Sequence, residues 1–194
     1  MSRKTDPKKL ERVLDAASDL FLSEGYDAAS MQQLADKLGL HKSSLYHYVD
    51  GKEDLLEQLT RSAQDKAEAD LAAAESDPDN GFLAALSLAI DQTLNDVGRT
   101  SLVLRQKPGT TTGDAVVERR RAYDRRLSKL IEAAQQSGKM RSDIHPMLLA
   151  RLTMGMVSWL VEWYDPALSR FGPEEIREAA LALVTSGVIV PEDD

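Results

Sequence analysis

Residues 31–50 read Met-Gln-Gln-Leu-Ala-Asp-Lys-Leu-Gly-Leu-His-Lys-Ser-Ser-Leu-Tyr-His-Tyr-Val-Asp. Apolar side chains recur here at the spacing that locks two short helices at a steep angle, at Leu34, Leu38, Leu40, Leu45 and Tyr48. Ala35 is small at the expected helix crossing, and Gly39 occupies the turn, where glycine adopts a positive φ without strain. The stretch therefore predicts a helix-turn-helix. The alternative is two core helices of a bundle joined by a chance glycine turn.

The solvent side of the second of these helices carries polar or cationic residues, namely His41, Lys42, Ser43, Ser44 and His47. No acidic residue occurs from position 37 to position 49, although the chain as a whole is acidic. A helix that enters the major groove keeps carboxylates away from the phosphates, and its short polar side chains can reach base edges. The pattern therefore favours a DNA-reading helix over an ordinary solvated face, which would mix both signs of charge.

Charge is distributed unevenly along the chain. The 194 residues include 24 basic and 32 acidic side chains, and the resulting net charge of -8 by itself argues against nucleic acid as a partner. Residues 1–52, however, hold eight basic and eight acidic side chains, so the whole acidic excess lies in 53–194. Because residues 1–12 are net basic, the local charge is compatible with DNA at the N-terminal end.

The composition excludes several classes of protein. The absence of cysteine excludes disulfide frameworks and thiolate zinc sites, and it fits a reducing, cytoplasmic location. No apolar run reaches the roughly 18–20 residues needed to cross a bilayer, and the N-terminus lacks the apolar segment of a secretory signal. We therefore expect no membrane association, no cofactor and no metal site.

Helical periodicity dominates the chain. Ser30 with Gln33, and Asp50 with Glu53, are capping-box patterns that open helices, and Pro-Gly-Thr-Thr-Thr-Gly at 108–113 predicts a flexible loop. No alternating strand pattern occurs, so the sequence predicts an all-α protein. We expect about nine helices, near 7–24, 30–38, 42–48, 53–75, 79–97, 100–107, 114–137, 146–164 and 173–187.

Residues 8–56 resemble the DNA-binding domain of the TetR family of bacterial repressors. The resemblance lies in the first helix, in Gly25-Tyr26 and in residues 33–56, and its most specific part is the string Leu45-Tyr46-x-Tyr48-x-x-x-Lys52. The all-helical remainder has the length that the family implies. Two positions depart from the pattern. A valine at position 49 stands where most members have phenylalanine, and a histidine at position 41 stands where a serine or threonine N-cap is usual.

The resemblance implies roles in binding double-stranded operator DNA. Base edges would be approached by Gln32, His41, Lys42, Ser43 and Ser44. Phosphates would be contacted by Tyr46, by His47, and by Lys52, whose ammonium would add to the free N–H groups of a helix N-terminus. Tyr48 is either a further groove contact or part of the core. Arg3 and Lys4 form a basic arm that reaches the DNA or else a solvated tail.

The same resemblance implies a helix-turn-helix domain of three helices over 1–52 and a C-terminal helical domain over 53–194 for effector binding and dimerisation. The helix at 147–163 is apolar almost all round, so it must be covered on several sides. With the last helix it would form the interface of a homodimer, through Leu148, Leu152, Ile176, Ala180, Leu183 and Val184. A two-fold dimer would present its recognition helices ~34–36 Å apart to a palindromic operator. The alternative is one internal core in a monomer.

The C-terminal domain is also expected to hold a small-molecule effector. Trp159 and Trp163 share a helix face and could line an apolar pocket with Leu86, Ile90, Tyr123 and Met154, although plain core packing explains the same residues. Arg119 belongs to an arginine cluster at 119–121 and 125–126, which either pairs with carboxylates or holds an anionic ligand group. The stretch Gly155-Met-Val-Ser-Trp159, followed by Trp163-Tyr164, is similar to family members that sense acyl-CoA-type ligands.

An enzyme is the main alternative class. The sequence offers no recognisable set of catalytic residues, because two of the three histidines lie on the expected DNA face and the third, His145, precedes a helix proline. Nucleophile-elbow and phosphate-loop motifs are absent as well. An architectural DNA-binding protein without an effector is a second alternative. We predict a non-enzymatic transcriptional repressor that a small molecule releases from its operator.

Overall fold

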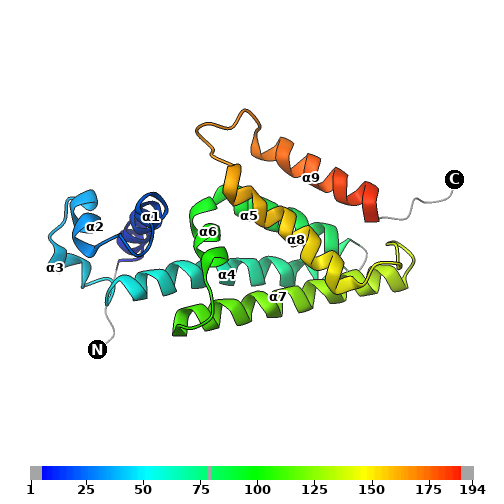
Figure 1. Ribbon diagram of the computed structural model, residues 1–194, viewed down its shortest axis with the longest axis horizontal. Helices are drawn as coiled ribbons and strands as arrows, with labels where there is room; N and C mark the ends of the chain where they lie inside the picture. The colour runs from blue at the N-terminus through cyan, green and yellow to red at the C-terminus, as the bar shows by residue number, and fades with distance from the viewer. Residues whose placement is uncertain (1–5, 78–79, 189–194) are drawn as a thin grey trace. The chain divides into compact units, whose positions relative to one another are not determined.

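The computed structural model describes residues 6–77 and 80–188, and over these residues it consists of helices without a strand. The predicted all-α fold is confirmed (Figure 1). The nine helices of the described residues are α1 (Pro7–Glu24), α2 (Met31–Leu38), α3 (Lys42–Leu45), α4 (Lys52–Ala74), α5 (Gly81–Asn95), α6 (Val97–Arg105), α7 (Thr111–Gln136), α8 (Pro146–Trp163) and α9 (Pro173–Val188).

Several helix boundaries differ from the predicted ones by one to three residues; α6, for example, spans Val97–Arg105 rather than 100–107. Two of the differences have a clear local cause. Helix α3 ends at Leu45 rather than Tyr48, because the N–H groups of His47 and Tyr48 bond to carbonyls three residues back and form a tighter turn. Helix α7 begins at Thr111, inside the predicted loop at 108–113. Thr110 explains this earlier start, since its hydroxyl accepts the N–H of Gly113 at 3.0 Å and so caps the first turn.

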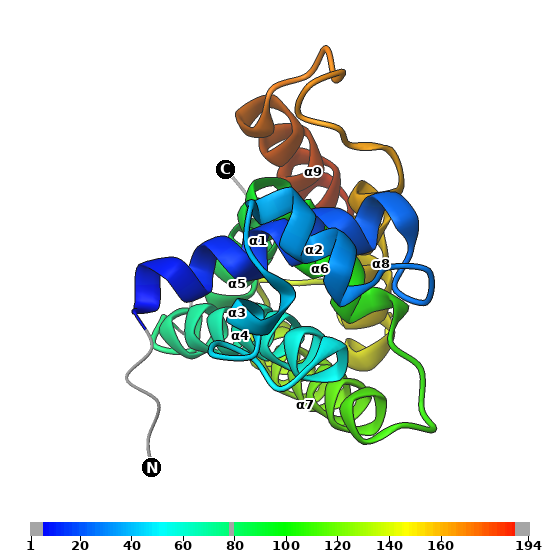
Figure 2. The ribbon, with the colours of Figure 1, turned by 90° about the vertical axis from the view of Figure 1, so that its left-hand side faces the viewer.

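Of the described residues, one compact unit comprises those up to Ala63 together with Gly98–Val116. Within it α1 packs on α2, and α2 packs on α3 (Figure 2). Its core is formed by buried apolar side chains of α1 to α4 and α6, among them Val13, Ala17, Leu34, Ala35, Leu45, Val49, Leu55, Leu59 and Leu102. The helix-turn-helix is therefore packed around its own core, and one leucine of that core comes from α6.

A second compact unit comprises the described residues of Gln64–Val97 and those from Val117 to Val188. In this unit α5 packs against both α8 and α9 (Figure 1). Its core combines buried residues of the second half of α4 with those of α5, α7, α8 and α9, among them Leu71, Leu86, Ile90, Leu127, Ile131, Leu149, Val157 and Ile176.

The compact units are interleaved in sequence, because α4 and α7 each contribute residues to both of them. The division into functional domains at residues 52 and 53 stays a prediction. No helix of the described residues combines the length and the apolar character that crossing a membrane would require.

Candidate nucleic-acid interface and effector region

The entry into α2 follows the capping box that the sequence predicts. The Ser30 hydroxyl accepts the N–H of Gln33 at 3.3 Å, and the Gln33 side-chain carbonyl accepts the N–H of Ser30 at 2.9 Å. At the other end of α2, Gly39 has a φ of 65°, a left-handed conformation that glycine adopts without Cβ strain. Its N–H and that of Leu40 bond back to the last turn of α2, which closes the turn toward α3.

The predicted base-reading residues of α3 lie on an exposed surface above a buried frame. Leu45 and Val49 are completely buried. The valine at position 49, where the family prefers phenylalanine, is therefore a core residue. Tyr48 is partly buried and packs against the same core, which agrees with the alternative that it is a core residue rather than a groove contact. The predicted DNA contacts of this segment remain accessible: Ser44 is half-buried, and the exposed ones are His41, Lys42, Ser43, Tyr46 and His47.

The start of α3 has no side-chain cap. His41 stands at the N-cap position, but its imidazole makes no capping hydrogen bond. On α2, the exposed Gln32 donates its amide N–H to Asp36 at 2.8 Å, so a base contact would require this bond to open. Arg3 and Lys4 lie outside the described residues.

Lys52 occupies a position that the sequence alone did not reveal. Its Nζ lies 2.7 Å from the carbonyl oxygen of Tyr26, 3.1 Å from that of Asp27 and 3.0 Å from that of Ala29. The same ammonium lies 4.5 Å from the centroid of the Tyr26 ring. The predicted phosphate contact of Lys52 stays a prediction.

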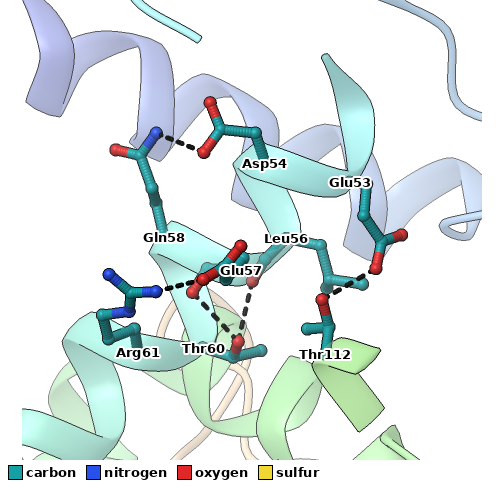
Figure 3. A network of polar contacts seen from close by, with 8 residues as sticks. All are labelled: Glu53, Asp54, Leu56, Glu57, Gln58, Thr60, Arg61 and Thr112. Carbon is teal, nitrogen blue, oxygen red and sulfur yellow. Dashed lines mark hydrogen bonds and ion pairs between the residues drawn. The ribbon is translucent and has the colours of Figure 1, made fainter. Parts of the chain in front are cut away.

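Glu53 joins three elements of the helix-turn-helix unit. Its carboxylate accepts the Thr112 hydroxyl of α7 at 2.7 Å (Figure 3). It also accepts the Tyr26 hydroxyl at 3.0 Å. The sequence predicts a capping box in which Glu53 accepts the N–H of Asp50. In the structure the carboxylate of Asp54 accepts this N–H, at 2.7 Å. Burial, together with the Glu53 carboxylate, raises the pKa of Tyr26, so its hydroxyl remains a donor.

Arg99 of α6 is a second residue that binds the helix-turn-helix unit together. One guanidinium nitrogen donates to the Ser62 hydroxyl at 3.0 Å, and the other lies 2.7 Å from the Asp15 carboxylate and also contacts Glu11. Sequence reasoning missed this residue, because its partners on α1 lie more than eighty positions away in the chain.

In the second compact unit, four of the predicted effector residues belong to one region. Leu86 and Ile90 are fully buried, and Tyr123 and Met154 pack half-buried against the same core. Burial raises the pKa of Tyr123 to about 12. The tryptophans are separate from this core, since Trp159 is 66% exposed and Trp163 45% exposed. The core-packing alternative thus fits Leu86 and Ile90 but not the tryptophans.

The arginine cluster on α7 is paired with carboxylates. Arg119 lies 2.7 Å from Glu68 and 2.5 Å from Asp65, and Arg126 donates two hydrogen bonds to Glu75 at 2.8 and 2.7 Å. These contacts match the alternative of a solvated, ion-paired face. A ligand anion at Arg119 would therefore have to replace a carboxylate. Over residues 6–77 and 80–188, no three His, Asp or Glu side chains gather in a way that could hold a metal ion.

Asp124 is a half-buried carboxylate on α7 that sequence reasoning missed. Its burial raises its pKa, although Arg151, Arg120 and Arg125 act in the opposite direction. A raised pKa in the folded state contributes stability that is present below the ordinary pKa of an aspartate and is lost as the pH rises through the folded-state value. Asp124→Asn should therefore melt at a higher temperature than wild type at pH 7, with the difference shrinking toward pH 4, as thermal unfolding followed by circular dichroism would report.

Asp143→Asn is the matched control, because Arg141 lowers the pKa of this exposed carboxylate, and no gain is expected at neutral pH. A lower melting temperature of Asp124→Asn at pH 7 would show that the arginines outweigh the burial.

The residues predicted for the dimer interface fall into two groups. Ile176, Ala180 and Val184 pack into the core of their own protomer rather than lying on its surface. Leu148, Leu152 and Leu183 are exposed. The exposed residues of α8 recur at helical spacing on one side of the helix, where Leu148, Leu152, Gly155, Trp159 and Trp163 form an apolar stripe that the charged, exposed Arg151 and Glu162 flank.

Comparison with known proteins agrees with this fold. The sequence model of the domain described as "Tetracyclin repressor-like, C-terminal domain" matches residues 84–188, more than half of the chain, and that of "Bacterial regulatory proteins, tetR family" matches residues 13–59. The chain is 25% identical to the HTH-type transcriptional repressor KstR2 of Rhodococcus jostii strain RHA1 over 192 residues, which is 93% of this chain and 91% of the relative.

Among solved structures, SCO3833, a TetR-family member of Streptomyces coelicolor A3, superposes with a TM-score of 0.78 at 28% identity and covers 99% of this chain and 94% of that one. AibR, solved in complex with isovaleryl coenzyme A and operator DNA, has a TM-score of 0.78 at 24% identity over 90% of this chain and 97% of that one. From the helix-turn-helix, the all-helical fold and both family matches, we conclude that the chain belongs to the TetR family of bacterial transcriptional regulators.

Proposed function

We propose that the protein is a homodimeric repressor that reads a palindromic operator with α3 and is released from it by a small-molecule effector. The observation that carries the DNA-binding part is the surface of α3. Lys42 and Ser43 of α3 are exposed together with the adjacent His41 and His47, α3 contains no carboxylate, and the segment rests on the completely buried Leu45 and Val49. Such a surface suits both base edges and phosphates.

The exposed stripe of α8 supports the dimer. The exposed leucines and tryptophans form an apolar stripe bordered by Arg151 and Glu162, and monomeric proteins rarely present such a stripe to water. Helix α9 adds the exposed Leu183 and the small, exposed Ala179 and Ala182, which permit close approach of a second helix. A two-fold axis through these helices would cover the stripe with its own copy and would place two α3 helices on one operator.

The effector part rests on the family and on the second compact unit. AibR binds isovaleryl coenzyme A, and we extend an acyl-CoA-type effector to this chain as a proposal. The acyl group would contact the region of Leu86, Ile90, Tyr123 and Met154. The phosphate groups of the effector's coenzyme A part would compete with carboxylates for the arginines of α7, Arg119 among them. An effector of this kind must bind the DNA-free arrangement more tightly than the DNA-bound one.

Selection of duplexes from a random pool by the full chain tests this function. We expect a palindrome whose half-sites lie about 10 base pairs apart, centre to centre. Lys42→Ala and Ser44→Ala should change the preferred base at fixed positions of each half-site, whereas Lys9→Ala, on the exposed surface of α1, should not. Isovaleryl coenzyme A should then weaken operator binding by roughly 5- to 150-fold, with free coenzyme A as the control. Enrichment of no sequence, or of one without symmetry, would refute the proposal.

A further inference from the structure

The first two residues of α4 that carry charge, Lys52 and Glu53, bind different parts of the chain. Lys52 holds the carbonyl oxygens of Tyr26, Asp27 and Ala29, and Glu53 holds the hydroxyls of Tyr26 and Thr112. A lysine ammonium has three N–H donors. All three are engaged by backbone carbonyls at 2.7–3.1 Å, and the Tyr26 ring lies against the same group.

We propose that Lys52 is a positioning residue, which clamps the segment 26–29 onto the start of α4 and thereby sets the DNA-reading helices, and that it does not contact a phosphate. This inference rests on the proposed DNA-binding function. A phosphate could recruit the ammonium only by removing it from carbonyls that would then need other partners.

The clamped segment leads directly into the helix-turn-helix. It connects the end of α1, at Glu24, to Ser30, the N-cap of α2. Ala29 is buried, so its carbonyl depends on a protein partner, and Lys52 supplies one. Because the Ser30 cap begins one residue later, the position of segment 26–29 sets where α2 starts and, through the turn at Gly39, how α3 is presented.

Tyr26 connects the two arms of the clamp. Its carbonyl and ring face Lys52, while its hydroxyl donates to Glu53. The other carboxylate oxygen of Glu53 accepts from the buried Thr112 (Figure 3). Tyr26 thus uses its backbone, its ring and its hydroxyl in one set of contacts, and Tyr26→Phe removes the hydroxyl alone.

The test compares Lys52→Met, which keeps the apolar stem but removes the donors, with Tyr26→Phe and wild type. Affinity for the selected operator and for a random-sequence duplex is measured by fluorescence anisotropy over a range of KCl concentrations, and amide hydrogen exchange is followed at residues 26–31. We expect Lys52→Met to weaken operator binding by about tenfold or more, which is about 1.4 kcal/mol. Random-sequence binding and the salt slope should stay unchanged, and exchange at 26–31 should become faster.

Lys42→Met serves as the control for a cation at the DNA, and it should reduce the salt slope by about one unit. If Lys52→Met also reduces the slope by about one unit and weakens both duplexes, Lys52 is a phosphate contact and the clamp is wrong. If exchange at 26–31 is faster but operator affinity is unchanged, the contacts are merely structural and the positioning role is wrong. Unchanged exchange refutes the clamp whatever the DNA result.

Tyr26→Phe should show the same pattern with a smaller loss, and it carries the test if Lys52→Met does not fold. The hydrogen-exchange measurement requires no DNA. If wild type selects no operator, the proposed function fails. Hydrogen exchange still shows whether Lys52→Met loosens residues 26–31, so the two failures can be told apart.

Discussion

Leu152→Arg is expected to convert the dimer into monomers and to abolish operator binding at concentrations where wild type is saturated. Leu152 lies in the α8 stripe and is 60% exposed, so the substitution should leave the fold of the protomer intact. In a two-fold interface the charge appears twice, and each buried charge without a partner costs about 3–5 kcal/mol. Even one such charge weakens the association by more than roughly a hundredfold.

Sedimentation velocity and tryptophan fluorescence measure this effect. The two tryptophans of the chain, Trp159 and Trp163, both lie on the stripe, so their emission should shift to the red when the stripe becomes hydrated. Ala133→Arg is the matched control, because it adds the same charge at an exposed position of α7 away from the stripe. A dimer of Leu152→Arg with unchanged emission would show that α8 does not form the interface.

Leu45→Ala is expected to destabilise the helix-turn-helix unit by about 2–5 kcal/mol, because it removes a completely buried side chain and leaves a cavity. Leu45 is the buried residue of the four-residue α3, so the surface that carries Lys42 and Ser43 loses its support together with stability. We therefore expect operator affinity to fall as well. Urea unfolding followed by circular dichroism gives the first quantity, and fluorescence anisotropy with the selected operator gives the second.

Leu22→Ala provides the comparison, since this leucine of α1 is 37% exposed and its truncation should cost well under half as much. Equal losses for the two substitutions would contradict the assignment of Leu45 to the core. An intact operator affinity for Leu45→Ala would contradict the supporting role of that core for α3.

Local signals in the chain predict most of the helices. The Asp6 carboxylate accepts the N–H of Lys8 at the start of α1, and Ser30 and Gln33 cap α2 reciprocally, as their sequence patterns predict. Caps and turns of this kind involve residues two to four positions apart, so they can be read without the fold. The boundary of α7 departs from the prediction because Thr110 and Asp114 convert a loop-like composition into a capped first turn.

The polar contacts that hold the DNA-reading unit together could not be predicted in the same way. Arg99 pairs with Asp15, and Thr112 with Glu53, across separations of 84 and 59 positions. A long cationic or hydroxyl side chain bonds to whatever the fold brings within about 3 Å of it, and sequence spacing contains no record of that neighbour. Lys52 illustrates the point, because its place in the string suggests a phosphate, whereas its ammonium donates to three carbonyls of segment 26–29.

From its sequence alone this protein could be assigned an all-helical fold, a helix-turn-helix and a carboxylate-free recognition surface. These features are encoded in residue type and in periods of three to four positions. The packing of the folded chain settled which apolar side chains face inward and which remain on the surface. Helix α8 is apolar almost all round, so its periodicity could not distinguish the buried Leu149 and Val157 from the exposed Leu152 and Trp159. That distinction arises because α5 covers only part of α8, and burial depends on neighbouring helices rather than on the helix itself.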